Sequence, residues 1–286
     1  SFNVTHYAIH LDNASTPLEN QFITIGSHQV FNHSDSSFNI GTIEGTRTLY
    51  AWAKDSTGNI GGPFTDTITL DTQPPILSIG NSPEEYTNVS SLSVSFTVDN
   101  ASEIRLTGHC GSDNFTNLST GSIDLGNLSE GNYSNCSLEA FDLAGNTSGS
   151  QSISSFTFDE TPPDNLSLVL NGGDNQTVME NITIALGGND TNGISQYCVQ
   201  RTSNASVPAD NDSCWVTADN STSFNTSFSN FGLGPNYEMK TVKAWYMDRA
   251  GNTADITSFI NKADPNQAPA FGNGNTQNFT LLENPV

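Results

Sequence analysis

The sequence predicts an all-β protein made of three tandem β-sandwiches, and three observations predict it. No stretch of the 286 residues keeps a 3.6-residue apolar period, so helix content should be near zero. Three strand-like stretches end in the pattern Asp-x-x-Gly-Asn: YAWAKDSTGN ends at Asn59, SLEAFDLAGN at Asn146 and KAWYMDRAGN at Asn252. A Pro-containing junction follows each stretch, at 69–75, 158–163 and 261–269. Repeats of roughly 100 residues suit sandwiches of seven short strands.

Each repeat contains a half-buried strand that ends in a hairpin. Counting back from Asp142, the even positions hold Ala140, Leu138 and Cys136, and the other two repeats show the same alternation. A period of two with one apolar face is typical of a strand that is buried on one side. Gly-Asn tolerates positive φ and turns the strand back. On this phase Trp52 and Trp245 should face outward, where they would be free to pack on a glycan or a neighbouring subunit.

The Pro-containing junctions divide the chain into domains, because proline stiffens a linker and stops strand pairing from running on. The predicted divisions are 1–73, a sandwich lacking its first strands; 74–161 and 162–266, sandwiches with one disulfide each; and 267–286, a donor strand for the next copy.

The first domain lacks strands that the third domain has. SQYCVQRTSNASVPADND (195–212) parallels THYAIHLDNASTPLENQ (5–21), so Tyr7 matches Tyr197. NITIAL (181–186) precedes Tyr197, whereas only six residues precede Tyr7. The C-terminal residues 268–286, here called the tail, resemble the opening strands of another sandwich, with NFTLL (278–282) in the place of NITIAL. We therefore expect the tail to form a strand beside 7–11 in the first domain of a following copy, burying Phe279, Leu281 and Leu282.

Two linkages between copies remain open. In one, separate subunits complete each other by strand donation, because a sandwich missing a strand exposes core and unpaired backbone. In the other, the sequence cuts one long repeat chain within a domain. Both predict a head-to-tail, open-ended fibre, so copies of the chain itself are the expected partners.

Composition excludes several classes of protein. The chain has 30 acidic and 8 basic residues, a formal charge of −22, so we expect no nucleic-acid partner. Only 13% of residues are charged, which argues against an acidic disordered tail. No apolar run reaches the length of a membrane helix, and Ser1 does not open a signal peptide. If the protein is secreted, its leader has been removed.

Candidate sugar acceptors and cysteine pairs indicate an extracellular, oxidising compartment. The triplet Asn-x-Ser/Thr occurs twenty times, which predicts dense N-glycosylation, although a chain rich in Asn, Ser and Thr also forms such triplets by chance. The cysteines form two local pairs without zinc-site spacing, so we expect the disulfides Cys110–Cys136 and Cys198–Cys214. The candidate acceptors are Asn3, Asn13, Asn32, Asn88, Asn100, Asn114, Asn117, Asn127, Asn132, Asn135, Asn146, Asn165, Asn175, Asn181, Asn189, Asn204, Asn211, Asn220, Asn225 and Asn278.

The combination of D-x-A-G-N with D-x-x-P-P resembles the tandem Ig-like repeats of bacterial and archaeal surface proteins. DLAGN and DRAGN fit this pattern, and DSTGN departs from it by one residue. The resemblance covers essentially the whole chain and implies Ig-like sandwiches at the cell surface. It is weak for function, because such repeats serve as stalks, adhesins, sheath components and enzyme appendages.

Calcium is the one ion that the resemblance implies, because related arrays hold Ca²⁺ near domain junctions through hard oxygen ligands. The alternative is that each hairpin aspartate caps its own turn. Candidate ligands are Asp71, Asp159 and Asp264 at strand ends, with Asp55, Asp142 and Asp248 at the hairpins.

No catalytic constellation emerges from the sequence, so we expect no enzyme and no required cofactor. His6 and His10 share one strand face, but such pairs are usually surface decoration. The first functional interpretation is a structural subunit of a heavily N-glycosylated extracellular filament or surface appendage. The alternatives are a carbohydrate-binding adhesin or stalk segment, and a non-catalytic appendage of a secreted enzyme.

Overall fold

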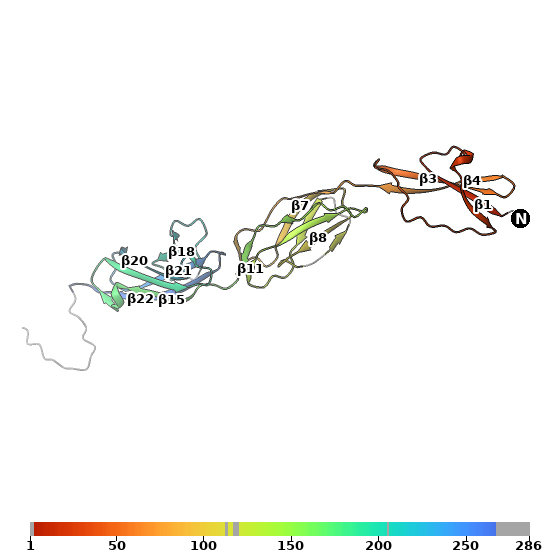
Figure 1. Cartoon of the computed structure of the whole chain (residues 1–286). Coiled ribbons are helices and arrows are strands. Elements are labelled where there is room, and N and C mark those ends of the chain that lie inside the picture. Colours follow the sequence, from red (N-terminus) through yellow and green to blue (C-terminus); the bar gives the residue numbers. More distant parts are fainter. Residues whose placement is uncertain (1–2, 112–113, 117–119, 205, 267–286) are drawn as a thin grey trace, which may run out of the picture. The chain divides into compact units, whose positions relative to one another are not determined.

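The computed structural model describes residues 3–111, 114–116, 120–204 and 206–266 (Figure 1). This part of the chain is all-β, as predicted. Its only helical elements are the three-residue 3-10 turns η1 (Glu19–Gln21) and η2 (Asn171–Gly173). None of its helices has the length and apolar character needed to cross a membrane. The tail positions Phe279, Leu281 and Leu282 lie outside the described residues.

Contacts divide the chain into two compact units. Unit 1 comprises residues up to Ser82 with Leu92–Gly126 and Ser134–Ser154, and unit 2 comprises Pro83–Ser91, Asn127–Tyr133 and the residues from Ser155 on. The domain boundaries expected from the sequence stay predictions.

Unit 1 begins with a four-stranded antiparallel sheet in the order β2-β1-β3-β4, here called the head sheet. The Asp-x-x-Gly-Asn hairpin joins its two long strands, as the alternation predicts. The strands are β1 (Val4–Leu11), β2 (Ile23–His28), β3 (Gly45–Asp55) and β4 (Ile60–Leu70).

Two further sheets of unit 1 have the orders β10-β7-β5 and β13-β12-β8-β9. Val94 and Phe96 on β7, with Ile104 and Leu138 on β8 and β12, are buried at alternate positions. A disulfide joins Cys110 to Cys136. The strands are β5 (Ile76–Ile79), β7 (Ser93–Asp99), β8 (Glu103–Thr107), β9 (Asn114–Thr116), β10 (Thr120–Asp124), β12 (Ser137–Phe141) and β13 (Gln151–Ser152).

Unit 2 contains sheets in the orders β11-β14-β6, β15-β17-β20 and β16-β22-β21-β18-β19. The second and third enclose one apolar core, in which Ile184, Val242, Tyr246 and Ile260 are fully buried. The strands are β6 (Tyr86–Thr87), β11 (Gly131–Tyr133), β14 (Phe156–Phe158), β15 (Asp164–Leu170), β16 (Gln176–Thr177), β17 (Asn181–Asn189), β18 (Ile194–Gln200), β19 (Val216–Thr217), β20 (Ser223–Gly232), β21 (Met239–Asp248) and β22 (Thr253–Lys262).

The prediction that two tryptophans face solvent is wrong. Trp52 is 2% exposed and Trp245 is 1% exposed. His10 packs on Trp52, with ring centroids 5.0 Å apart. Cys198 is the cross-strand neighbour of Trp245 and is bonded to Cys214, which holds the loop 201–215 near that face. A period of two shows which face is apolar, but it does not show whether a loop covers the other face.

Candidate functional site

The three Asp-x-x-Gly-Asn hairpins share one hydrogen-bonding pattern. Asp55 Oδ1 accepts the backbone N–H of Asn59 at 2.9 Å, and Asn59 Nδ2 donates to Asp55 Oδ2 at 2.8 Å. The pairs Asp142–Asn146 and Asp248–Asn252 repeat both bonds. Hydrogen bonds to the ionised carboxylate lower the pKa of Asp55 to about 2, and the bond from the Asn59 side chain has the largest effect. Capping of its own turn therefore accounts for the aspartate at position 55 of the first hairpin.

In unit 1 the second hairpin also binds the segment that follows β4. Asn146 Nδ2 donates to the backbone oxygen of Asp71 at 2.9 Å as well as to Asp142 Oδ2. Asp71 and Asp142 line a cavity of about 430 Å³ together with Asp99, which ends β7. We call Asp71, Asp99, Asp142 and Asn146 the first junction cluster.

In unit 2 the third hairpin makes the equivalent contact. Asn252 Nδ2 donates to the backbone oxygen of Asp159, just after β14, at 2.8 Å. Asn192 adds a second bond, from Nδ2 to Asp159 Oδ2, at 2.8 Å. The asparagine that ends the Asp-x-x-Gly-Asn hairpin thus binds the backbone of a strand-end aspartate in both units. The second junction cluster is Asp159, Asp190, Asn192, Asp248 and Asn252.

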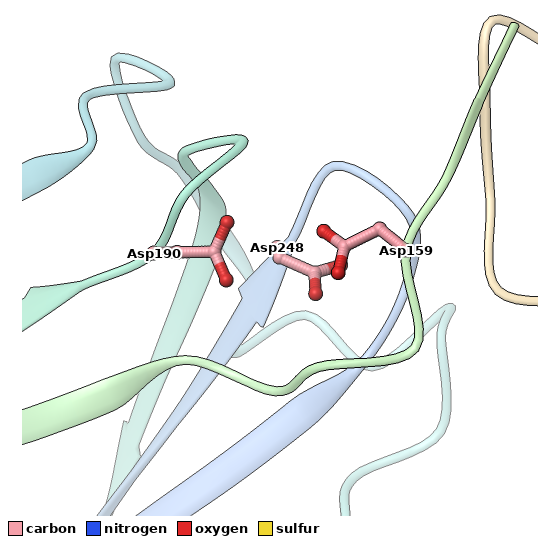
Figure 2. A group of neighbouring side chains, drawn as sticks. All are labelled: Asp159, Asp190 and Asp248. Carbon is pink, nitrogen blue, oxygen red and sulfur yellow. The ribbon is translucent and has the colours of Figure 1, made fainter. Parts of the chain in front are cut away.

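Three carboxylates of the second cluster face one another. Oxygens of Asp159, Asp190 and Asp248 lie within 4.8 Å of each other, and all three residues are buried. Figure 2 shows Asp248 between the other two. In the described chain no lysine, arginine or histidine forms an ion pair with them.

This crowding changes the protonation of the cluster. Burial raises the pKa of Asp248 to about 6, and the charges of Asp190 and Asp159 add to the effect. Burial likewise raises the pKa of Asp190. The hydrogen bonds from Asn252 oppose the shift at Asp248 but do not cancel it. A bound proton and a hard divalent cation are two ways to neutralise such a site, because carboxylate oxygens are calcium ligands.

The predicted calcium ligands are therefore not all brought together. Asp159 and Asp248 lie in the second cluster, Asp71 and Asp142 line one cavity in the first, and Asp55 binds its own turn. The backbone N–H of Asn266 donates to Asp264 Oδ1 at 2.8 Å.

Sequence reasoning missed Asp190, which directly follows the strand β17 and begins the next turn. Its backbone neighbours bind it, because the N–H groups of Asn192 and Gly193 both donate to its Oδ1 at 2.8 Å. Asp99 is the last residue of β7, at the corresponding end of that strand. An aspartate thus recurs at the end of the equivalent strands β7 and β17. This recurrence is the sequence signal from which Asp190 could have been found.

The candidate glycosylation sites lie mostly at the surface. Among those whose exposure the structure describes, none is buried; Asn3, Asn146 and Asn189 are half-buried and the others are exposed. Asn146 differs from the rest, because its Nδ2 donates to both Asp142 and Asp71. A glycan on that nitrogen would compete with both bonds.

The histidines do not form a metal site in the described residues. His6 Nδ1 lies 2.9 Å from Thr5 Oγ1, and His10 packs on Trp52.

No family model matches the sequence, and no curated protein matches it. Solved structures offer distant likenesses. The fibronectin(III)-like modules of Clostridium thermocellum CbhA are 12% identical over 66% of this chain and 94% of theirs, with a TM-score of 0.38. A tetra-tandem repeat from the extending region of a large adhesion protein is 17% identical over 92% and 68%, at 0.33. A chain from a structure that concerns host cell surface retention of a 1.5-MDa bacterial ice-binding adhesin is 12% identical over 91% of this chain and 86% of that chain, with a TM-score of 0.35.

Proposed function

We propose that the chain is a structural segment of an N-glycosylated extracellular fibre or surface appendage, built of Ig-like sandwiches in head-to-tail order. Its role in this proposal is mechanical rather than catalytic. Copies follow one another either by strand donation between subunits or as one continuous repeat chain.

The repeated junction carries this proposal. Asn146 and Asn252 each bind a backbone oxygen at the end of a preceding strand, Asp71 and Asp159 respectively. A net contribution of ~0.5–1.5 kcal/mol for each hydrogen bond is small, but the bond fixes the chain where a linker would otherwise swivel. A protein whose junctions are specified by the same residues each time is suited to bear load along its length.

Two further features support an extracellular location. The disulfide Cys198–Cys214 joins β18 to a nearby loop, and Cys110–Cys136 joins a residue after β8 to the residue before β12. Such bonds persist in oxidising compartments. The exposed candidate acceptors are spread over both units, as a sugar coat along a fibre requires.

The alternative, a carbohydrate-binding adhesin or stalk segment, loses one of its supports. A sugar-binding face needs accessible aromatic rings, and the two equivalent tryptophans that suggested one are buried.

Electron microscopy of native material together with glycopeptide analysis tests the proposal. We expect thin filaments and sugar on most of the exposed acceptor asparagines. Isolated globular particles, or fewer than about five occupied sites among the acceptor triplets, would overturn it.

A further inference from the structure

The loop that follows β2 resembles a strand of unit 2 in sequence. FNHSDSSF (31–38) has the spacing of FNTSFSNF (224–231), which forms most of β20. The aromatic contact below it is also repeated, because the ring centroids of Tyr7 and Phe31 are 5.4 Å apart, as are those of Tyr197 and Phe224. Phe31 and His33 therefore contact Tyr7 of the head sheet, as Phe224 of β20 contacts Tyr197 of β18.

Residues 31–38 nevertheless form no strand. In unit 2, β20 pairs along its length with β17, from Asn189 opposite Ser223 to Asn181 opposite Gly232. In the described part of unit 1 no strand lies beside 31–38. Backbone groups that have a strand partner in one repeat thus lack one in the other, which is the condition for adding a strand.

The head sheet beneath this loop is also incompletely covered. Leu49 and Ala51 on β3 are half-buried, whereas their counterparts Val242 and Ala244 on β21 are fully buried. On the neighbouring strand Phe64 and Ile68 are exposed. The missing cover corresponds to β17 and β15 of unit 2.

The strand β1, which contains residues 7–11, already lies between β2 and β3, so the expectation that the tail pairs beside 7–11 is wrong. We propose instead that residues 278–286 of a second copy of this chain form the strand that pairs with 31–38 and covers the head sheet. This inference rests on the proposed fibre and assigns the contact between its copies. The segment NFTLLENPV aligns with β17, NITIALGGN, so that Asn278 takes the place of Asn181. Phe279 and Leu281 then stand where Ile182 and Ile184 are buried. Pro285 ends the ladder, because proline has no N–H to donate.

Charge complementarity supports this register. The main polar departure of the tail is Glu283, which stands where β17 has Leu186. In β20 the residue opposite Leu186 is Thr226, and the corresponding residue of the head is His33. A cross-strand pair of Leu and Thr is thus replaced by a pair of Glu and His. His33 Nε2 lies 3.0 Å from the hydroxyl of Tyr7, so the head already holds this ring at the proposed contact.

One position opposes the docking. Asp35 stands where β20 has Phe228, and it lies opposite the place of Leu281. Replacing this aspartate by an apolar residue should therefore strengthen the contact between copies.

Paired cysteines in the full chain test the register. The variants Asp35→Cys with Leu281→Cys, and His33→Cys with Glu283→Cys, place thiols directly opposite each other. The swapped combinations, Asp35→Cys with Glu283→Cys and His33→Cys with Leu281→Cys, use the same four substitutions but leave the thiols two residues out of register. Disulfides need Cα atoms within about 7 Å, so only the matched pairs should link. His33 is the middle residue of the acceptor triplet at Asn32, and cysteine in its place keeps the Asn-x-Ser pattern.

On mild oxidation we expect a ladder of disulfide-linked oligomers from the matched pairs and little from the swapped pairs, with both native disulfides intact by peptide mapping. Equal linking in the two sets overturns the inference. So does a link within one chain that persists on dilution, or native material in which residues N-terminal to Ser1 fill this place.

A charge exchange tests the same contact without thiols. His33→Glu alone should weaken association by about fivefold, the factor equivalent to ~1 kcal/mol of cross-strand pairing, and Glu283→His added to it should restore association. If the double variant is no better than the single one, the proposed pair is wrong. Filaments with sugar but without these links would leave the proposed function standing and remove only this inference.

Discussion

The head sheet and the sheet containing β21 are built on one plan, yet only one of them is the wall of a complete core. Both contain, in this order, a short edge strand, a strand bearing a tyrosine, the hairpin strand and its return strand, and β16 extends the second sheet beyond its return strand. Ile68 and Ile260 lie opposite the equivalent positions Arg47 and Lys240, but Ile68 is 47% exposed and Ile260 is 0% exposed. The alternation along a strand therefore indicates which face can be buried, and the presence of a second sheet decides whether that face is buried.

The same contrast reaches the hairpin aspartates. Asp55, the last residue of β3 in the head sheet, has a pKa lowered to about 2 by hydrogen bonds within its turn. Asp248 has the same turn, but burial beside two other aspartates raises its pKa to about 6. One motif thus gives opposite electrostatic outcomes because its neighbours differ.

The largest expected difference is between two isoleucines. Ile260→Ala should destabilise unit 2 by ~2–5 kcal/mol, because it leaves a cavity in a closed core. Ile68→Ala should cost less than ~0.5 kcal/mol in the unassembled chain. Hydrogen exchange measured separately in peptides of β22 and β4 checks this, since a chain with several folding units does not unfold in one step. Equal losses at the two positions would mean that the head sheet is covered in solution.

The next difference concerns the disulfide that the head lacks. Cys198 lies opposite Trp245, whereas Ala8 lies opposite Trp52. Replacing Cys198 and Cys214 by alanine should cost ~3 kcal/mol, the value for a closed loop of about 15 residues. It should also shift tryptophan fluorescence to the red, because the loop 201–215 would no longer be held near Trp245. Unchanged emission would show that the loop stays in place without the bond.

A smaller difference should appear in the pH dependence of stability. The folded-state pKa of Asp248 is raised, so its contribution is full below its ordinary pKa and is lost as pH rises through about 6. Between about pH 4 and about pH 7.5 the wild type should lose ~1–2 kcal/mol in unit 2 relative to Asp248→Asn. Asp55→Asn is the matched control, and because the pKa of Asp55 is lowered it should show no such change in this range.

Calcium offers a second arm of the same experiment. An ion held by Asp159, Asp190 and Asp248 would neutralise the charges that destabilise the cluster at high pH. Added Ca²⁺ should then flatten the pH dependence of the wild type and leave Asp248→Asn nearly unaffected. If the ion changes neither curve, the cluster is neutralised by protons and binds no calcium.

The sequence predicted the strands because their alternation is local. Leu138 and Ala140 are buried where the phase from Asp142 puts them, and the Asp-x-x-Gly-Asn turns form the expected hairpins. Which segment covers a face, and which strands contribute to a cluster, depend on residues that are distant in the sequence. Trp52 is covered by His10, one residue before the end of a different strand. Asp190 joins the second junction cluster from the end of β17, a strand that the repeat motif does not include.

The smallest expected effect distinguishes a turn from a junction. Asn59 binds its own turn, through Asp55 and Thr57, whereas Asn146 also binds the backbone oxygen of Asp71. Asn59→Ala should therefore cost little, because water replaces its bonds at an exposed turn. Asn146→Ala should cost ~0.5–1 kcal/mol more, the net value of one further hydrogen bond in a half-buried place.

Hydrogen exchange of the segment 69–75 gives the readout, since of the two asparagines only Asn146 binds that segment. The same bond predicts that Asn146 carries no sugar although it lies in an acceptor triplet, because both protons of its Nδ2 are engaged. Glycopeptide mapping checks this second consequence. A glycan on Asn146 in folded material would show that the hydrogen bond to Asp71 does not hold the junction.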